Sequence, residues 1–504
     1  MAYSLTHETK IAVIGAGSMG SGIAQLAAQS GHAVRLFDMQ PGAAARALQR
    51  IGNDLAGAVK KGRIDEAERA AVLGRLQAVE SIEALAGCGL AVEAIVERLD
   101  AKQALFEQLE SLLGGAAVLA TNTSSISITA VAQGLARPQR LVGWHFFNPA
   151  TRMKLVEVIA GVETDQALVA AMHALSKAWG KTPVDAPNAP GFIVNRVARP
   201  YYAEGLRLLA ERIAAPQAID RLLREAGGFA LGPFELIDLI GADVNLSVTE
   251  SVFAATGYDT RYAPNLIQQE LVRAGRHGRK AGIGFYDYRD GARPKAVEVV
   301  APSAAPPKLA VGLAPGVLAA LAERLGRAGV AVHTDTGLED AGFAIDGIRI
   351  ALTDGRSAAE RHALDGRPTV LLDLARDFAT TTVVGATGGA VPLGLLAALL
   401  RPAGIEVVAL ADVAGLVVMR TVACLANEAA DVMTWTGTSA ADIDTAMRLG
   451  TAYPVGPLAW ADALGVGRVA TVLANLQAHY GDARYRLAPR LAAARFEGAR
   501  LAHG

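Results

Sequence analysis

The segment from Lys10 to Asp38 constrains the fold of this chain more than any other stretch. It reads KIAVIGAGSMGSGIAQLAAQSGHAVRLFD. The apolar run 11–14 has the length of a buried parallel strand, and a second apolar run, 33–37, ends on Asp38. Between the two runs a G-x-G-x-x-G pattern leads into apolar residues at helical spacing, which Gly31 ends. The pattern predicts a strand–helix–strand unit that opens a doubly wound α/β domain.

Each glycine of the pattern has its own physical role. Gly15 permits the tight turn, Gly17 lets a pyrophosphate approach the backbone, and Gly20 lets the helix pack close to the strand. Asp38 follows Gly15 by about 20 residues, where a carboxylate can hold ribose hydroxyls. We therefore predict a dinucleotide site, with a purely structural glycine turn as the alternative. The predicted cofactor contacts in this unit are Gly15, Gly17, Ser18, Met19, Gly20 and Asp38.

The residues around Asp38 also indicate which dinucleotide binds. Met39 and Gln40 follow it, so no neighbouring Arg or Lys is available to meet a 2′-phosphate. The carboxylate itself would repel such a phosphate. The sequence therefore favours NAD over NADP.

The composition excludes several classes of protein. The 504 residues suffice for three or four domains, and 48 basic against 49 acidic side chains give no electrostatic case for nucleic acid or an anionic membrane. Cys88 and Cys424 cannot form a disulfide framework or a metal-type cysteine cluster, so we expect a reducing cytoplasm and no metal. The first ten residues have no apolar signal core. The most apolar later run, 405–419, contains Glu406 and Asp412 and is typical of a buried strand and helix, not of a membrane span.

After Asp38, two helices are expected over 43–61 and 66–76, as a hairpin with Lys60 and Lys61 near its tip. These lysines could form a solvated basic end or hold an anionic carrier such as the phosphates of CoA. A strand over 90–95 with Glu97, a helix over 100–113 and a strand over 117–120 follow.

The polar run TNTSSISI, 121–128, comes next, at the strand end where ligands bind in parallel sheets. Ser127 suits a helix N-cap and Ser124 a substrate contact. The alternative is that all these hydroxyls serve turns and caps.

Two further strands carry the candidate chemistry. His145 lies in the strand 141–147, and Glu157 is the one carboxylate in the apolar strand 154–160. A lone strand histidine is usually structural, but a carboxylate in an apolar strand needs a partner. If the strands are adjacent, Glu157 can hold one ring nitrogen of His145 and leave the other free to accept a proton.

From Asn188 the pattern becomes all-helical and ends with GRKAGIGFYDY, 278–288, before a Pro/Ala linker at 301–307. Helical periodicity covers 201–209, 218–223, 234–239 and 244–253. Residues 426–465 then repeat this region without gaps: Pro233 and Asp238 recur 224 positions later as Pro457 and Asp462.

Between the copies, strand candidates at 309–312, 330–333, 369–374, 382–385 and 407–410 indicate a Rossmann-like domain. Its first turn, 312–316, lacks the glycine fingerprint. In the second copy Met419 stands 224 positions after Asn195. We therefore expect the second half to keep the fold but to carry no chemistry of its own.

Seven stretches in order over roughly 8–290 resemble the L-3-hydroxyacyl-CoA dehydrogenase family. They are IGAGSMGSGIA, VEAIVE, NTSSISI, HFFNP with KLVEVI, PGFIVNR, LGPFELIDLIG and GRKAGIGFYDY. The whole layout resembles the family's long bacterial members, some of which act on 3-hydroxyadipyl-CoA in phenylacetate breakdown and others on 3-hydroxybutyryl-CoA.

The resemblance implies roles for individual residues. His145 would be the catalytic base and Glu157 its orienting partner, and Ser124 and Asn195 would contact the substrate hydroxyl. Lys60 or Lys61 would contact CoA. The implied NAD contacts outside the glycine unit are Glu97, Lys102, Asn122, Asn148 and, from the helical domain, Lys280.

The resemblance implies an NAD-dependent oxidation of a 3-hydroxyacyl-CoA, bound between the first sheet and the first helical domain. A dehydrogenase of a small free hydroxy acid, or a crystallin-like NAD binder without turnover, are the alternatives. The short members pair their helical domains between subunits, so this chain is expected as a homodimer or as a monomer with an internal pseudo-dimer. The expected domains are 1–187 (NAD-binding, Rossmann), 188–300 (helical, copy 1), 301–408 (degenerate Rossmann-like) and 409–504 (helical, copy 2).

Overall fold

The computed structural model describes residues 3–290, 292, 295–304, 309–311, 316–334 and 342–502. Two compact units make up the chain: residues 1–196 with 441–451, and residues 197–440 with 452–504. The predicted domain limits after 187, 300 and 408 stay predictions. Part of the predicted linker (305–307) and most of the predicted first turn of the second Rossmann-like domain (312–315) lie outside the described residues. No helix of the described part is both long and apolar enough to cross a membrane.

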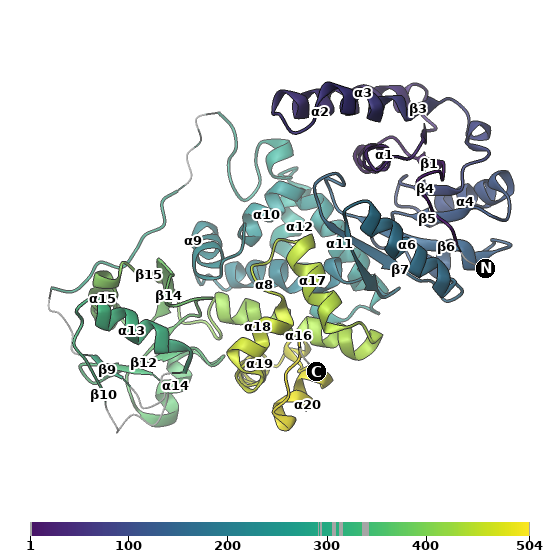
Figure 1. Cartoon of the computed structure of the whole chain (residues 1–504). Coiled ribbons are helices and arrows are strands. Elements are labelled where there is room, and N and C mark those ends of the chain that lie inside the picture. The colour runs from purple at the N-terminus through teal and green to yellow at the C-terminus, as the bar shows by residue number, and fades with distance from the viewer. Residues whose placement is uncertain are drawn as a thin grey trace. The chain divides into compact units, whose positions relative to one another are not determined.

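The first unit is built on an eight-stranded sheet in the order β3-β2-β1-β4-β5-β6-β7-β8 (Figure 1). All neighbours are parallel except β6 and β7, which run antiparallel. This is the mostly parallel, doubly wound sheet that the sequence predicts. The strands are β1 (Ile11–Ile14), β2 (Val34–Phe37), β3 (Leu76–Val79), β4 (Leu90–Glu93), β5 (Val118–Thr121), β6 (Leu141–Phe146), β7 (Leu155–Ile159) and β8 (Thr182–Ala186).

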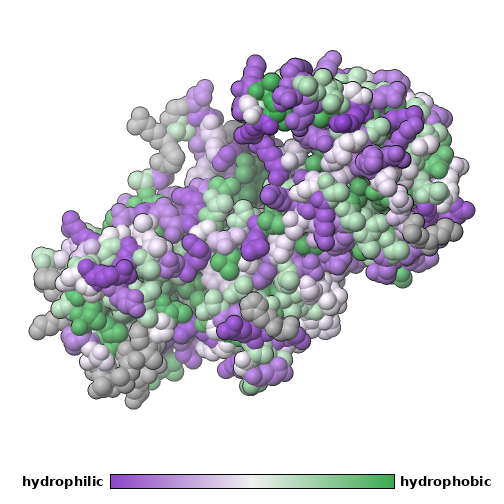
Figure 2. Space-filling model, in the orientation of Figure 1, coloured by the Kyte–Doolittle hydropathy of each residue, from purple (hydrophilic) through white to green (hydrophobic). Residues whose placement is uncertain are grey.

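The helices that the sequence predicts in this unit lie where expected, with one local correction, and the helix over 166–178 had no sequence prediction. Helix α3 ends at Gly74, not at residue 76, because Leu76 starts β3, which pairs with β2. Strand β8 also had no sequence prediction. Helices α2 and α3 run side by side as the expected hairpin, and Figure 2 shows its tip as hydrophilic. The helices are α1 (Ser18–Gln29), α2 (Ala43–Lys60), α3 (Glu66–Gly74), α4 (Leu99–Leu113), α5 (Ile128–Val131), α6 (Gln166–Ala178), α7 (Val194–Val197) and α17 (Ala440–Gly450).

The second unit contains a seven-stranded mixed sheet in the order β10-β9-β11-β12-β13-β14-β15. The sequence predicted five of these strands and missed β11 and β12. The residue that precedes the linker belongs to this sheet region, since Val300 N donates to Val407 O. The strands are β9 (Leu309–Val311), β10 (Val332–Thr334), β11 (Phe343–Ile345), β12 (Ile348–Leu352), β13 (Thr369–Leu372), β14 (Val383–Thr387) and β15 (Glu406–Ala409), with helices α13 (Ala319–Arg327), α14 (Ala358–Asp365) and α15 (Ala390–Leu400).

The remaining helices of the second unit form the two predicted copies. Helix α10 (Pro233–Ile240) of copy 1 recurs as α18 (Pro457–Leu464), an offset of 224. The backbone repeats as well, because Phe192 and Leu416 both have a positive φ, of 48° and 55°. Copy 1 has α8 (Arg199–Ala210), α9 (Pro216–Arg221), the π-helical turn η3 (Leu222–Ala226), α11 (Ala242–Ala255) and α12 (Leu266–Arg273); copy 2 has α16 (Val418–Thr436), α19 (Val466–Tyr480) and α20 (Pro489–Glu497).

Reciprocal polar contacts join the two copies within the second unit. Glu204 of copy 1 accepts from Tyr485 Oη at 3.0 Å, and Glu428 of copy 2, 224 positions later, accepts from Tyr262 Oη at 2.6 Å. Each of the two carboxylates is buried. Such an exchange of equivalent contacts is what a two-fold interface produces.

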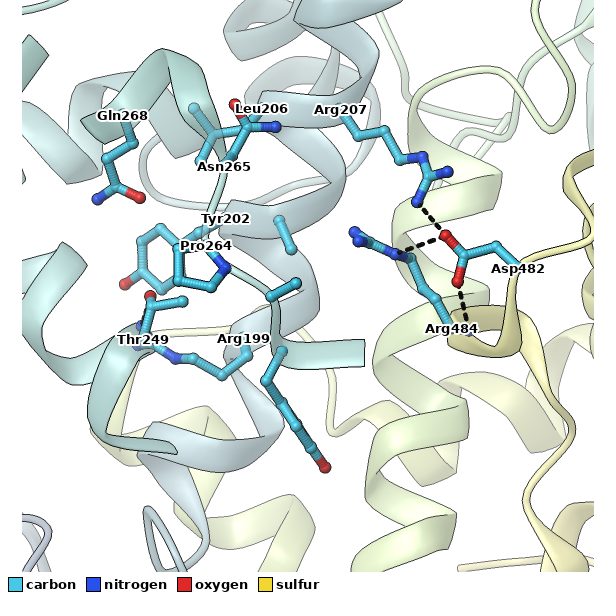
Figure 3. Close-up of a pocket in the computed structure, with 13 residues that line it drawn as sticks. Arg199, Tyr202, Leu206, Arg207, Thr249, Pro264, Asn265, Gln268, Asp482 and Arg484 are labelled. Atoms are coloured by element: carbon cyan, nitrogen blue, oxygen red, sulfur yellow. Dashed lines mark hydrogen bonds and ion pairs between the residues drawn. The ribbon is translucent and has the colours of Figure 1, made fainter. Parts of the chain in front are cut away.

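A cavity of about 300 Å³ lies between α8, the α11–α12 region of copy 1 and the start of the 3₁₀ helix η8 (Ala483–Tyr485) in copy 2. Figure 3 shows Arg207 reaching across it to Asp482, at 2.9 Å. Arg199 in the same cavity donates to Thr249 Oγ1. The Arg207–Asp482 contact makes the cavity part of the interface between the copies.

Candidate functional site

Strands β6 and β7 bring His145 and Glu157 together. The antiparallel register places the two residues directly opposite each other. His145 Nδ1 lies 2.7 Å from Glu157 Oε2, and the ring nitrogen must donate, because a carboxylate only accepts. The contact that the sequence predicts between His145 and Glu157 is therefore present in the structure. The arrangement leaves Nε2 with a lone pair for a proton.

The Glu157 carboxylate is fixed from a second side. Its Oε1 accepts from the backbone N–H groups of Ile193 and Val194, both at 3.0 Å, and the side chain has no exposed surface. The His145 ring packs near Phe147 and Phe192, with centroids 4.6 and 5.8 Å away. The imidazole is therefore held in one orientation by a buried anion and two aromatic rings.

The polar run after β5 lies beside the segment that carries Asn195. Asn195 Nδ2 donates to the backbone oxygen of Ser124 at 3.4 Å. Ser124 and Ser125 both donate to Glu97 through their N–H and hydroxyl groups. Ser124, Asn195 and Glu97 come from three separate stretches of the sequence. The structure brings them into contact, as expected of residues of one site. Ser127 caps α5 as predicted.

Lys102 holds two carboxylates beneath this run. Its Nζ lies 2.6 Å from Glu93 and 3.2 Å from Glu97. Burial raises the pKa of Glu97, but the Lys102 ammonium and the hydrogen bonds from Thr123 and Ser124 outweigh it and leave the pKa below its usual value. Glu97 is therefore an acceptor at neutral pH. Sequence reasoning missed Glu93, although a carboxylate at the end of an apolar strand is the same signal that identified Glu157.

The glycine loop has the geometry expected of a phosphate site. Gly15 has a φ of 104°, and a Cβ there would collide with the backbone oxygen of Ala94. A Cβ on Gly20 would collide with Gly15 itself, but one on Gly17 would meet no described atom within 4 Å. Helix α1 has no side-chain cap, so its first N–H groups are available to an anion. The loop lines a cavity of about 1080 Å³, which has room for a dinucleotide.

Asp38 sits at the rim of this cavity with two arginines that sequence reasoning missed. Its Oδ2 accepts from Ala16 N at 2.7 Å, which ties the end of β2 to the glycine loop. Arg46 and Arg50, both on α2, line the same cavity, and Arg50 donates to Ala16 O at 2.8 Å. Two basic side chains from α2 therefore line the cavity, although no basic residue directly follows Asp38 in the sequence. Asp38 lines the same cavity, and its carboxylate is still expected to repel a 2′-phosphate.

We expect Asp38→Ser combined with Met39→Arg to shift cofactor preference toward NADP. The change removes the repelling carboxylate and adds a cation beside Arg46, where the extra phosphate would bind. The measurement is kcat/KM for NAD and for NADP, in the parent and in the variant. Met39→Arg alone is the control, since it adds the cation but keeps the carboxylate. A parent chain that used both cofactors equally would contradict the prediction.

The other expected contacts divide into those near the site and those elsewhere. Asn122 Oδ1 accepts from Phe146 N at 2.8 Å, next to His145, and Asn148 Oδ1 accepts from Ser18 Oγ at 3.4 Å, beside Met19 in the loop. Lys60 and Lys61 are exposed at the end of α2. Lys280 belongs to the second unit, where its Nζ lies 2.7 Å from Asp243. The roles of these residues stay predictions.

The second sheet has a related pair of strands without the histidine. After β13, Asp373 donates its N–H to Gly385 O in the antiparallel neighbour β14, so Asp373 and Gly385 stand opposite each other as His145 and Glu157 do. The buried Asp373 carboxylate accepts from the N–H groups of Val417, Val418 and Met419. The first two lie 224 positions after the donors to Glu157. The second half keeps the anchor between carboxylate and backbone but lacks a base.

We expect Asp373→Asn to destabilise the chain by about 2–4 kcal/mol. The carboxylate accepts four backbone N–H groups, including that of Leu374, and an amide oxygen with two lone pairs cannot serve them all. Urea unfolding followed by circular dichroism gives the free energy of unfolding. Asp377→Asn, at a more exposed turn of the same loop, is the matched control. Equal unfolding midpoints for the two variants would contradict the prediction.

Three family descriptions match the chain. The 3-hydroxyacyl-CoA dehydrogenase NAD-binding domain matches residues 10–189, and the C-terminal domain of the same family matches twice, at 191–288 and 415–502. The reduced Rossmann-fold domain of 3-hydroxybutyryl-CoA dehydrogenase matches residues 350–413. The second and third matches confirm the duplication and the reduced second Rossmann domain.

Individual relatives agree with these matches. The chain is 43% identical to the 3-hydroxyadipyl-CoA dehydrogenase of Escherichia coli K12, over 94% of this chain and 95% of the relative. A crystal structure of 3-hydroxybutyryl-CoA dehydrogenase from E. coli K12 superposes with a TM-score of 0.89 at 41% identity, covering 98% of this chain and 99% of the other. The (S)-3-hydroxybutyryl-CoA dehydrogenase of Ralstonia eutropha covers 56% of this chain and 100% of its own length, with a TM-score of 0.55 and 37% identity.

Proposed function

Since the chain belongs to the 3-hydroxyacyl-CoA dehydrogenase family, it is an NAD-dependent oxidoreductase of a 3-hydroxyacyl-CoA, and we propose that His145 is the base of this reaction. The contact of 2.7 Å between His145 and the buried Glu157 carries the proposal. His145 Nε2 takes the proton of the 3-hydroxyl group, and Glu157 stabilises the imidazolium that results. NAD supplies the acceptor for the hydride that leaves C3. In the reverse direction His145 returns the proton.

We also propose that Ser124 and Asn195 hold the substrate oxygen next to His145. Their mutual contact, and the proximity of Asn195 to the Val194–Glu157 hydrogen bond, support this assignment. Glu97, Lys102, Asn122, Asn148 and Lys280 are proposed NAD contacts, and Lys60 or Lys61 a CoA contact. Gly15, Gly17, Ser18, Met19, Gly20 and Asp38 are the proposed core of the NAD site.

The acyl group is the finer part of the proposal. The relatives named above include a 3-hydroxyadipyl-CoA and 3-hydroxybutyryl-CoA dehydrogenases, so both substrates are candidates. We propose a role in fatty acid β-oxidation or phenylacetate catabolism in the cytoplasm. The test is NADH formation from 3-hydroxybutyryl-CoA, longer 3-hydroxyacyl-CoAs and 3-hydroxyadipyl-CoA, with the free 3-hydroxy acids in parallel. Turnover of the free acids alone would favour the small hydroxy-acid reading, and NAD binding without turnover would favour the crystallin-like reading.

We propose that the second helical copy takes the place of a partner subunit. The reciprocal pairs Tyr485–Glu204 and Tyr262–Glu428 support this reading, because a homodimer would form the same contacts between chains. In the described part of the second half, Gly385 stands opposite the anchoring carboxylate of Asp373, where a histidine would be needed. One active site and one NAD per chain are therefore expected.

A further inference from the structure

Helix α17 belongs to the second helical copy but groups with the first unit, where residues 441–451 join residues 1–196. Ile443, Ala446 and Met447 on this helix have no exposed surface. Gly450, the last residue of the helix, continues the same face by the 3- and 4-residue spacing of an α-helix. Helix α17 therefore packs one continuous face against the rest of the first unit.

The end of that face lies against the site. A Cβ on Gly450 would stand 2.8 Å from Leu155 Cδ2 and 3.0 Å from Val194 Cγ2. Leu155 is two residues before Glu157 in β7, and the Val194 N–H donates to Glu157 Oε1. Carbon atoms in contact prefer 3.5–4.0 Å, so any side chain at 450 would push these residues.

The backbone does not require glycine at this position. Gly450 lies within a helix and has no left-handed φ, and the equivalent residue of copy 1 is Ala226. Two residues later, Gly228 of copy 1 has a φ of 77°, whereas copy 2 has Ala452 with a φ of 54°. Copy 2 thus lacks glycine where the backbone favours it and has glycine where the neighbours leave no room.

The corresponding segment of copy 1 docks in the same manner on the second sheet. Ala226 O accepts from Arg376 N at 2.8 Å, and Leu222 Cδ1 lies next to Gly385, which stands opposite Asp373. This second case involves different residues and a different sheet. Docking of this helix onto the strand pair of a Rossmann domain is therefore a repeated feature of the chain.

We propose that Gly450 is a positioning residue of the active site: the end of α17 fixes Val194, and through its N–H the Glu157 carboxylate that orients His145. This inference rests on the proposed function of the His145–Glu157 pair. It assigns the second copy a part in the reaction, in addition to covering the first.

The test compares two glycine-to-alanine variants of the second copy. Gly450→Ala makes Val194 shift by a few tenths of an ångström. Because a misplacement of about 1 Å can cost roughly 100-fold, we expect kcat to fall roughly 2- to 10-fold, with the dissociation constant for NAD unchanged. Gly467→Ala is the matched control, because it lies in helix α19 with no described atom within 4 Å of its new Cβ. Its kcat should equal that of the parent. A kcat for Gly450→Ala equal to that of Gly467→Ala would overturn the inference.

Val194→Ala is a second variant, which keeps the inference testable if Gly450→Ala does not fold. The smaller side chain leaves space at the contact, so kcat should fall, and adding Gly450→Ala should fill that space and restore it. A double variant no better than Val194→Ala alone would also overturn the inference. His145→Gln, assayed in parallel, separates the two proposals. If His145→Gln turns over like the parent, the function proposed for His145 fails, whatever the Gly450 result.

Discussion

Replacement of His145 by glutamine is expected to lower kcat by about 10²–10⁴, because the variant keeps a polar side chain of similar length but loses the proton acceptor. NAD binding should persist, since the glycine loop and Asp38 make no contact with the ring among the hydrogen bonds described here. Steady-state kinetics with a 3-hydroxyacyl-CoA and calorimetric titration with NAD measure the two quantities separately.

Glu157→Gln should lower kcat as well, because the neutral amide cannot stabilise the imidazolium. The control is His173→Gln, which removes another histidine–carboxylate pair, His173–Asp185 at 2.8 Å, from a partly exposed position outside the site. That variant should retain the parent kcat. If His145→Gln and Glu157→Gln both turned over like the parent, the proposed mechanism would be wrong.

A chain that ends near residue 295 is expected to aggregate or to dimerise. It retains His145 and Glu157 but loses copy 2, which supplies Arg420 and Tyr485 to the buried Glu204. The apolar surface that copy 2 covers around Glu204 is then open to water and needs a partner. Light scattering coupled to size-exclusion chromatography gives the mass of the truncated chain.

The full-length chain, titrated with NAD by calorimetry, is the companion measurement, and it should bind one NAD. A truncated chain that remains a stable monomer would contradict the pseudo-dimer reading. Two NAD per full-length chain would contradict the reading of the second half as fold without chemistry.

The sequence predicts the parts of the site that lie within continuous strand–turn–helix units. The glycine loop and Asp38 are read from one segment, and Glu157 is conspicuous as a carboxylate between apolar residues. Its pairing with His145 follows because consecutive strands are usually neighbours. The structure confirms that geometry at 2.7 Å.

The missed parts depend on contacts between distant residues or on weak local signals. Arg46 and Arg50 enter the NAD cavity from α2, and an arginine on an amphipathic helix looks like any exposed charge. Strand β3 begins at Leu76, where the helical periodicity of α3 continues in the sequence. Gly450 carries no side chain to suggest a contact, and its neighbours Leu155 and Val194 are about 250 to 300 residues away in the sequence.

The ion pair between Arg420 and Glu204, at 2.6 Å, joins two halves of one polypeptide. Its formation is therefore unimolecular, and dilution does not weaken it, whereas a pairing between separate chains is lost by mass action. The covalent connection also means that the two faces of the interface can mutate independently. In a homodimer one substitution alters both faces, whereas in this chain it alters only one. That freedom is visible where Met419 occupies the place of Asn195, and it allows the covering half to specialise without loss to the half that carries the chemistry.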